Sequence, residues 1–246
     1  SYDQALKLKP DYHQAWNNLG FVLFHLGRYE EAISSYNRTL KLNSEFYPAW
    51  YNHGITLAHQ GKNVEAIDSY DKALSFQPDD PYIWHSRGVA VAKLDRHQEA
   101  LSCYDRSIDL LAENYEPWYE RSKTLIELKQ YSAARASFEQ TLKLRAKDPA
   151  IWHSYGIMQA LQQEYTAALE SYDRAIAINP HFYQAWYERG NVLLELKRYE
   201  NAITNYDRAI AIAPNFYPAI QGKGQSLFKL HRYVEAIASY DAALAT

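Results

Sequence analysis

Apolar and polar residues follow two superimposed rhythms along this chain of 246 residues. Over short stretches, apolar or small residues recur at intervals of three and four, which places them on one face of an α-helix. Over the whole chain the pattern returns every 34 residues, most visibly at Trp16, Trp50, Trp84, Trp118, Trp152 and Trp186. A pattern that returns at such a period without insertion predicts one supersecondary unit stacked many times, because a single unit cannot bury its apolar face alone.

Numbering each unit so that its tryptophan is the fourth residue gives units that begin at 13, 47, 81, 115, 149, 183 and 217. Places 4, 8 and 11 then share one face of a first helix, and places 20, 24 and 27 share one face of a second. Place 8 is glycine except at Ser122, place 20 is always alanine, and place 24 is always tyrosine or phenylalanine. We expect the small residues to let the helices approach closely while the aromatic side chains at 4 and 24 fill the remaining volume.

Candidate helix ends follow from proline and aspartate. Pro78, Pro180 and Pro214 stand at place 32, where we expect them to stop the second helix. Asp80 and Asp148 each precede a proline, an arrangement that predicts an N-cap followed by proline in the first helical turn. The chain is therefore predicted to be all-α, an α-solenoid of antiparallel helix pairs.

The residues Trp16-x-x-Leu19-Gly20, Ala32-x-x-x-Tyr36 and Pro78 closely resemble the tetratricopeptide repeat, in the form of the long arrays common in bacteria. The resemblance covers the whole chain and implies a right-handed superhelix whose first helices line a concave groove for peptides. We expect a single array, 1–246, with a second-helix remnant of a truncated repeat at 1–12. Its repeats are 13–46, 47–80, 81–114, 115–148, 149–182, 183–216 and 217–246, the last one truncated, which suggests a window of a longer protein.

Places 2, 5, 9, 12 and 13 lie nearly opposite the packing face of the first helix, and the resemblance places them in the groove. Aromatic and apolar residues are frequent there, although places 9 and 12 could also serve to pack first helices against each other. The candidate partner-binding residues on or beside this face are Asn17, Phe21, Tyr51, Asn52, His85, Tyr119, Glu120, Glu127, His153, Tyr187, Glu188, Asn191 and Glu195.

Place 5 alternates between tyrosine and histidine through Tyr51, His85, Tyr119, His153 and Tyr187. Duplication of a two-repeat block explains this alternation, and so does a ligand with a matching rhythm. Tyrosine suits recognition because it combines an apolar body with a polar tip. The repeats also differ in charge: the first two have no charged groove residues, whereas the fourth and sixth supply most of the glutamates. A protein or peptide with apolar and basic residues would fit.

The cationic side chains at place 7 are expected to pack their aliphatic stems on the edge of the core, with their charged heads in water or at a helix-terminal carbonyl. They are Arg87, Arg121, Arg189 and Lys223. A role in ligand binding is the alternative. The pairs at places 25 and 26, such as Asp71-Lys72 and Asp173-Arg174, are interpreted as solvated surface.

Other kinds of chemistry lack support in the sequence. The net charge of −3 gives no basic footprint for nucleic acid, and no apolar stretch approaches the roughly 18 residues of a membrane span, so we expect a soluble, cytoplasmic chain. His25 and His59 sit one repeat apart with no third ligand, and neither a metal nor a cofactor is expected. Cys103 lies beside Tyr104 and is expected to be a buried structural thiol. No nucleophile or phosphate-loop motif is present, so these residues are not expected to form an enzyme.

Two functions fit this pattern. One is a protein–protein interaction scaffold that binds a peptide or helix in its groove, and the other is a regulatory or substrate-presenting module of a larger kinase, protease or glycosyltransferase. The carboxylate clamp known in the family cannot be assembled, because Tyr187 and Gly222 occupy two of its places.

Two properties of the array itself are also predicted. Ser122, Arg135 and Ala146 make the fourth repeat the expected site of local opening. Packing faces at the truncated ends, with Tyr2 and Ala5 at one end and Tyr240 and Ala243 at the other, predict end-to-end self-association.

Overall fold

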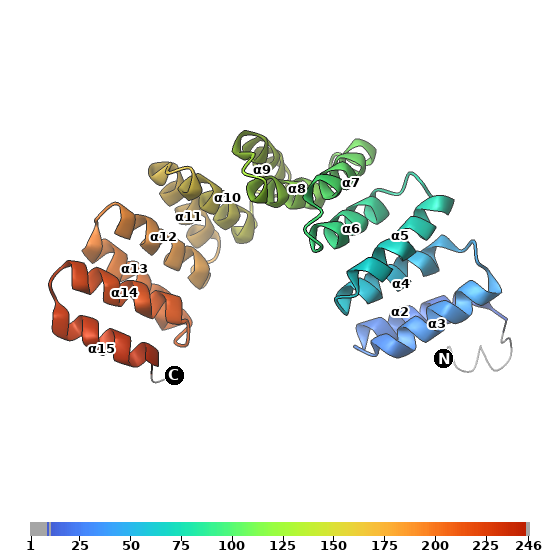
Figure 1. Cartoon of the computed structure of the whole chain (residues 1–246), viewed down its shortest axis with the longest axis horizontal. Coiled ribbons are helices and arrows are strands. Elements are labelled where there is room, and N and C mark those ends of the chain that lie inside the picture. The colour runs from blue at the N-terminus through green and yellow to red at the C-terminus, as the bar shows by residue number, and fades with distance from the viewer. Residues whose placement is uncertain (1–8, 10, 245–246) are drawn as a thin grey trace. The chain divides into compact units, whose positions relative to one another are not determined.

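The computed structural model describes residues 9 and 11–244, with side-chain burial up to Asp241. In this part of the chain all regular structure is helical and forms fourteen helices, α2 to α15, in sequential antiparallel pairs (Figure 1). The predicted all-α solenoid is thus confirmed. The predicted remnant at 1–12, with Tyr2, Ala5 and Pro10, falls largely outside the described residues, as does the side chain of Ala243.

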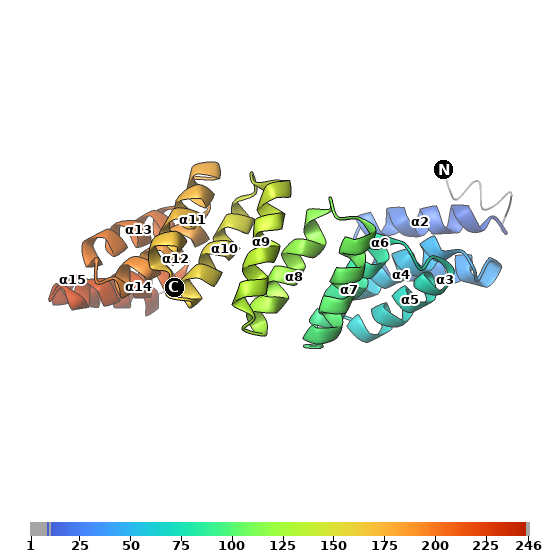
Figure 2. The ribbon, with the colours of Figure 1, turned by 90° about the horizontal axis from the view of Figure 1, so that it is seen from above.

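The chain divides into two compact units, 1–129 and 130–246, and each is described by itself. Within each unit, successive helices lie side by side in chain order (Figure 2). The first unit contains α2 (His13–His25), α3 (Tyr29–Leu42), α4 (Tyr47–His59), α5 (Asn63–Phe76), α6 (Pro81–Ala92), α7 (His97–Leu110) and α8 (Tyr115–Glu127). The second contains α9 (Tyr131–Arg145), α10 (Pro149–Leu161), α11 (Tyr165–Ile178), α12 (Tyr183–Glu195), α13 (Tyr199–Ile212), α14 (Tyr217–Lys229) and α15 (Tyr233–Leu244).

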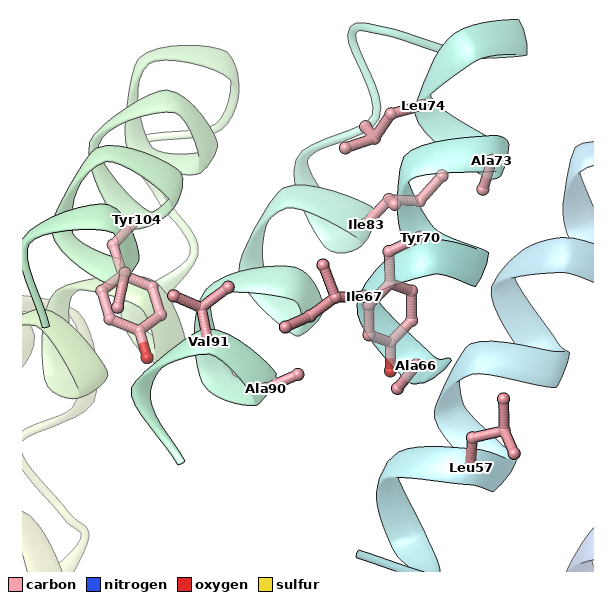
Figure 3. Packing of buried hydrophobic residues seen from close by; sticks show 11 residues of the cluster. Leu57, Ala66, Ile67, Tyr70, Ala73, Leu74, Ile83, Ala90, Val91 and Tyr104 are labelled. Atoms are coloured by element: carbon pink, nitrogen blue, oxygen red, sulfur yellow. The ribbon is translucent and has the colours of Figure 1, made fainter. Parts of the chain in front are cut away.

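In every repeat except the fourth, which has Ser122 at place 8, a glycine in the first helix lies against an aromatic ring in the second. Tyr70 is 1% exposed and lies so close to Gly54 that a Cβ built on this glycine would be 2.6 Å from Tyr70 Cε1. Tyr70 belongs to a cluster in which α5 and α6 contribute Ile67, Leu74 and Ile83 (Figure 3). The expected close approach at place 8 is therefore a direct consequence of the buried ring at place 24.

The tryptophans at place 4 contribute to the packing but are only half-buried. Trp50, Trp84 and Trp186 pack against the core clusters, whereas the largest fully buried side chains are those at place 24. Trp84 Nε1 donates to the Pro78 carbonyl at 2.8 Å, and Trp186 Nε1 donates to the Pro180 carbonyl at 3.0 Å. Each indole thus ties the end of one repeat to the start of the next, which keeps its edge close to solvent.

The helix starts follow the predicted capping. Asp80 Oδ1 accepts hydrogen bonds from the backbone N–H groups of Tyr82 and Ile83, and Asp148 Oδ1 accepts one from that of Ala150. The expectation for proline needs correction. The second helices of the first and third repeats, which have Ser44 and Ala112 at place 32, end at the same place as those followed by proline. Proline is therefore compatible with the helix end but is not what sets it.

The turn inside each repeat uses a left-handed residue at place 15. Gly27 and Gly61 occupy it with φ of 73° and 78°, whereas Lys197 has φ of 58° there. The non-glycine residues with this conformation are Asp95, Lys129, Gln163, Lys197 and His231. Left-handed backbone costs an L-residue other than glycine about 1 kcal/mol, so these turns carry local strain that the packed helices hold in place.

The cations at place 7 form ion pairs with the aspartate at place 25 of the preceding repeat. Arg87 Nε lies 2.6 Å from Asp71 Oδ1, and Arg189 Nε lies 2.8 Å from Asp173 Oδ1. Arg121–Asp105 and Lys223–Asp207 repeat the contact. These heads are therefore directed neither to water alone nor to helix ends, and the place-25 aspartates are not merely solvated. Both expectations were wrong for the same reason: the paired residues belong to neighbouring repeats, and the pattern of a single repeat does not show that they lie close together.

Two further expectations concern single repeats. Cys103 is buried beside Arg87, whose Nη1 lies 3.0 Å from Sγ, and burial raises the pKa of the thiol. The structural-thiol interpretation is thus supported.

The division between the compact units falls at 129/130, in the turn of the fourth repeat. Arg135 of this repeat pairs with Glu164, and both residues belong to the second unit. The expected local opening of this repeat remains a prediction.

Candidate functional site

In each compact unit the first helices of the repeats present a surface that contains a hollow. We call this surface of each unit its first-helix face; it consists of the outward sides of α4 and α6 in the first unit and of α10 and α12 in the second. The repeat-2/3 hollow has a volume of about 400 Å³ and lies between α4 and α6. The repeat-5/6 hollow has a volume of about 210 Å³ and lies between α10 and α12.

The repeat-2/3 hollow combines aromatic and polar groups. Tyr70 forms part of its lining, and Tyr51 stands beside it with its hydroxyl 3.3 Å from Ser86 Oγ. Burial raises the pKa of Tyr51. His85 of α6, Lys93 directly after α6 and Glu116 of α8 also line the hollow. The repeat-2/3 hollow thus offers a ring surface with hydroxyl and imidazole groups, one cation and one carboxylate.

The repeat-5/6 hollow has one apolar and one acidic side. Repeat 5 contributes the apolar side and the ring of Tyr172, through Ile157, Ala160, Leu161, Tyr165 and Tyr172. Repeat 6 contributes Glu188, Asn191, Val192 and Glu195. Tyr206 donates to Asn191 Oδ1 at 2.8 Å, and Asn191 Nδ2 donates to Glu188 Oε2 at 3.1 Å. This chain of hydrogen bonds orients one carboxylate of the acidic side.

The two hollows occupy the same register three repeats apart. Tyr70 and Tyr172 both hold place 24, while Ala58 and Ala160 both hold place 12. Four other repeats have larger side chains at place 12, such as Phe24 and Leu194, and the third repeat has Ala92 there. In the first repeat the ring of Phe24 packs against that of Tyr29 in a tilted arrangement, with ring centroids 5.7 Å apart. Alanine at place 12 is thus a feature that the two hollows share, although it is not unique to them, and the prediction from place 5 did not use it.

Two place-5 histidines carry unpartnered polar atoms. His85 Nε2 and His153 Nε2 are buried without a hydrogen-bond partner among the described residues. Burial lowers the pKa of both imidazoles, for His153 to about 4. Both rings are therefore neutral at pH 7 and can each accept or donate a hydrogen bond, depending on the tautomer.

Place 5 is also part of the fold. Tyr51 and Tyr187 lie over the place-24 rings of their own repeats, Tyr70 and Tyr206, with centroids 6.1 Å apart in both cases. Tyr187 contacts Phe216 edge to face at 5.1 Å. The predicted tyrosines are half-buried. Only part of each ring faces outward, so the predicted aromatic ladder stays a prediction.

The predicted asparagines of the first repeats have structural partners. Asn52 Nδ2 donates to Asn17 Oδ1 at 3.2 Å, and Asn17 is 8% exposed. This contact joins place 5 of repeat 1 to place 6 of repeat 2. The contact between Tyr51 and Ser86 joins the same two places of repeats 2 and 3. Phe21, by contrast, is 50% exposed, and its ring contacts that of His25 with centroids 4.5 Å apart.

The predicted glutamates differ in how their charges are compensated. Glu120 pairs with Lys123 at 2.7 Å, and Lys123 Nζ also lies 4.8 Å from the centroid of the Tyr119 ring. Glu127 and Glu195 are exposed, and Glu188 is half-buried. Burial raises the pKa of Glu188, and the hydrogen bond from Asn191 partly opposes this shift. The structure therefore brings Glu188, Asn191 and Glu195 together in one hollow, whereas Glu120 belongs to another part of the chain.

The histidine, cysteine and carboxylate side chains of the described residues form no group of three that could hold a metal ion. None of the helices in this part of the chain has both the length and the hydropathy required to cross a membrane.

Comparison with known proteins adds two kinds of similarity. Models of the tetratricopeptide repeat match residues 13–46, 54–95, 119–181 and 183–216. Among solved structures, a tetratricopeptide repeat protein from Parabacteroides merdae aligns with a TM-score of 0.76 at 18% identity, over 95% of this chain and 92% of that chain. The MamA protein aligns with a TM-score of 0.61 at 23% identity, over 67% of this chain and 90% of that chain.

A third solved structure is YrrB, described as a tetratricopeptide repeat protein with an unusual peptide-binding site. It aligns with a TM-score of 0.63 at 22% identity, over 75% of this chain and 95% of that chain. At these identities the structural matches show the fold. No curated protein matches the sequence.

Proposed function

This chain belongs to the tetratricopeptide repeat family, whose members are generally protein–protein interaction modules, and on that premise we propose that it is a scaffold that binds a peptide or a helix of a partner protein along its first-helix face. The observation that carries this proposal is the pair of hollows at one register of that face. They can receive side chains of one extended or helical segment in each unit, as a binding module of this kind requires.

Unpartnered polar atoms at the hollows support a ligand. Tyr172 lines the repeat-5/6 hollow, and its hydroxyl is buried without a partner among the described residues. His85 Nε2 has the same status and His85 lines the repeat-2/3 hollow. A buried polar atom without a partner costs about 1–3 kcal/mol, and a ligand group that satisfies it offsets part of that cost. YrrB, a structural neighbour with a peptide-binding site, supports the same class of ligand.

The proposal is tested by selecting a displayed library of random twelve-residue peptides against the protein and then filling the hollows. Ala58→Leu and Ala160→Leu place a larger apolar side chain at a position where other repeats already have Phe24 or Leu194. We expect selected peptides to bind at least tenfold more weakly to one or both variants. Ala211→Leu, on the exposed side of α13, is the matched control and should leave affinity unchanged. Peptides that bind all three variants as tightly as the parent would show that the first-helix face is not the binding surface.

A further inference from the structure

The repeat-5/6 hollow has two carboxylates but no cation. Glu188 and Glu195 both line it, and neither forms an ion pair with any residue that the structure describes. Four other glutamates of the chain, Glu120, Glu164, Glu200 and Glu235, do have a cationic partner. An unpaired carboxylate in a half-buried position is costly, because desolvation disfavours its charged form.

The opposite side and the base of the hollow are suited to an aliphatic chain with a polar head. Ile157, Ala160 and Leu161 form an apolar side that faces the acidic residues of α12 across the hollow. Tyr172 lines the hollow as well; its side chain is 0% exposed, and its hydroxyl oxygen has no hydrogen-bond partner among the described residues. That oxygen can accept a hydrogen bond from an ammonium or guanidinium group, both of which only donate.

The hydrogen bonds around Asn191 prepare one carboxylate for such a ligand. Tyr206 fixes Asn191 Oδ1, so the amide NH₂ is directed to Glu188 Oε2. Glu188 is thereby held in a defined orientation while its other oxygen has no partner among the described residues. Preorganised acceptors of this kind favour a cation over a neutral group, because the charge-assisted hydrogen bonds are stronger and little reorganisation is needed.

The repeat-2/3 hollow provides an internal comparison. At places 6 and 13 of its second repeat it has Ser86 and Lys93, where the repeat-5/6 hollow has Glu188 and Glu195. The two sites share their register and the tyrosine at place 24 but differ in charge: the repeat-2/3 hollow is lined by one carboxylate, Glu116, and the cation Lys93, whereas the repeat-5/6 hollow is lined by two carboxylates and no cation. An equivalent apolar side chain could enter either hollow, whereas a cation is attracted more strongly by the repeat-5/6 hollow.

We infer that the repeat-5/6 hollow binds a lysine or arginine side chain of the partner, with the aliphatic stem on Ile157, Ala160 and Leu161 and the charged head between Glu188, Glu195 and the Tyr172 hydroxyl. This inference rests on the proposed function and specifies the chemistry of one contact in it. Lysine and arginine combine an apolar stem with a cationic head and therefore match both sides of the hollow.

The test is a thermodynamic cycle on a peptide selected from the displayed library. Replacing its lysine by norleucine keeps the stem and removes the charge, and Glu188→Gln/Glu195→Gln keeps the shape of the protein side and removes its charges. An arginine at this position is replaced by the isosteric neutral citrulline. We expect each change alone to weaken binding at least tenfold and the two together to weaken it little further, because they remove the same interaction.

Controls separate this contact from general electrostatics and from the proposed function. Glu170→Gln/Asp241→Asn removes the same net charge at exposed positions outside the hollow and should weaken binding less than threefold. Thermal unfolding should show Glu188→Gln/Glu195→Gln to be at least as stable as the parent, since an unpaired half-buried charge is removed. Loss of binding without loss of stability would not follow from a purely structural role.

Three outcomes contradict the inference in distinguishable ways. Selected peptides that lack basic residues, or that bind the glutamine variant unchanged yet lose affinity on Ala160→Leu, would show an apolar pocket and leave the proposed function intact. If the change in the peptide and the change in the protein each weaken binding and their effects add in the double variant, the basic residue of the peptide binds elsewhere on the protein. Failure to select any peptide, or indifference to both hollow-filling variants, would overturn the inference together with the proposed function.

Discussion

Arg189 and Asp173 connect consecutive repeats through an ion pair of 2.8 Å between Nε and Oδ1. The pair is partly exposed, at 26% and 57% of the two side chains, so we expect its coupling energy to be only about 0.2–1 kcal/mol. A double-mutant cycle with Arg189→Met and Asp173→Asn, read by urea unfolding, measures it. The coupling should decrease as salt is raised. Glu139 holds the same place as Asp173, but the following repeat has Tyr155 where a cation would pair with it. Glu139→Gln should therefore change stability by less than Asp173→Asn, and a larger effect would contradict the assignment.

Gly54→Ala tests the close approach of the paired helices. Helix propensity alone would make this change stabilising by up to about 1 kcal/mol. The new Cβ would lie 2.6 Å from Tyr70 Cε1, and the ring is buried and cannot move away easily. We therefore expect a net loss of about 1–3 kcal/mol in the free energy of unfolding. In a Tyr70→Leu background, which removes the ring, the same substitution should cost less; an equal cost would mean that the ring is not the obstacle.

Lys197→Gly tests the strain in the turn at place 15. Lys197 has φ of 58°, a conformation that glycine adopts without the steric cost of a Cβ. The released strain of about 1 kcal/mol is partly offset by the larger backbone entropy of glycine in the unfolded chain, so a small gain in stability is expected. Gly61→Ala introduces the opposite change at the equivalent place and should be destabilising. The prediction would be wrong if both substitutions shifted the unfolding midpoint in the same direction.

The half-buried His153 predicts a loss of stability at acidic pH. Burial lowers the pKa of His153 to about 4, below its ordinary value of about 6.5. Between these two values the unfolded chain binds a proton that the folded chain does not, so stability falls as the pH decreases through this window, by up to about 3 kcal/mol. Urea unfolding of the parent and of His153→Gln from pH 7.5 to pH 4 measures this effect. Glutamine cannot take up a proton, and the pH dependence should be smaller in the variant; identical slopes would contradict it.

Local opening is expected to concentrate in the fourth repeat. Its sequence departs from the others at Ser122, Arg135 and Ala146, and the division between the two compact units falls in its turn. Because the stability of an array is approximately a sum of repeat and interface contributions, its weakest repeat should open most often. Native-state hydrogen exchange should show faster exchange in α8 and α9 than in α12 and α13. Equal protection of the fourth and sixth repeats would contradict this prediction.

The regular pattern of the sequence was sufficient to predict the fold. Residues that are neighbours within one repeat, such as Gly54 and Tyr70, or Asp80 and the first turn of α6, were predictable because the helix period places them together. Within one repeat the sequence separation is short and the geometry is the same each time. The helices and their antiparallel pairing, and the close contact at place 8, therefore follow from the sequence.

Contacts between repeats could be identified only from the tertiary structure. The Trp84 indole on the Pro78 carbonyl and the Arg189–Asp173 pair depend on how far and at what angle one repeat is displaced on the next. The repeat-5/6 hollow depends on the same displacement, because it exists only where the short side chain of Ala160 meets the first helix of the following repeat. Sequence analysis could identify Glu188 and Glu195 as acidic residues on an outward face. That they share a hollow with the buried hydroxyl of Tyr172 was decided by packing between helices, which no periodicity within one helix encodes.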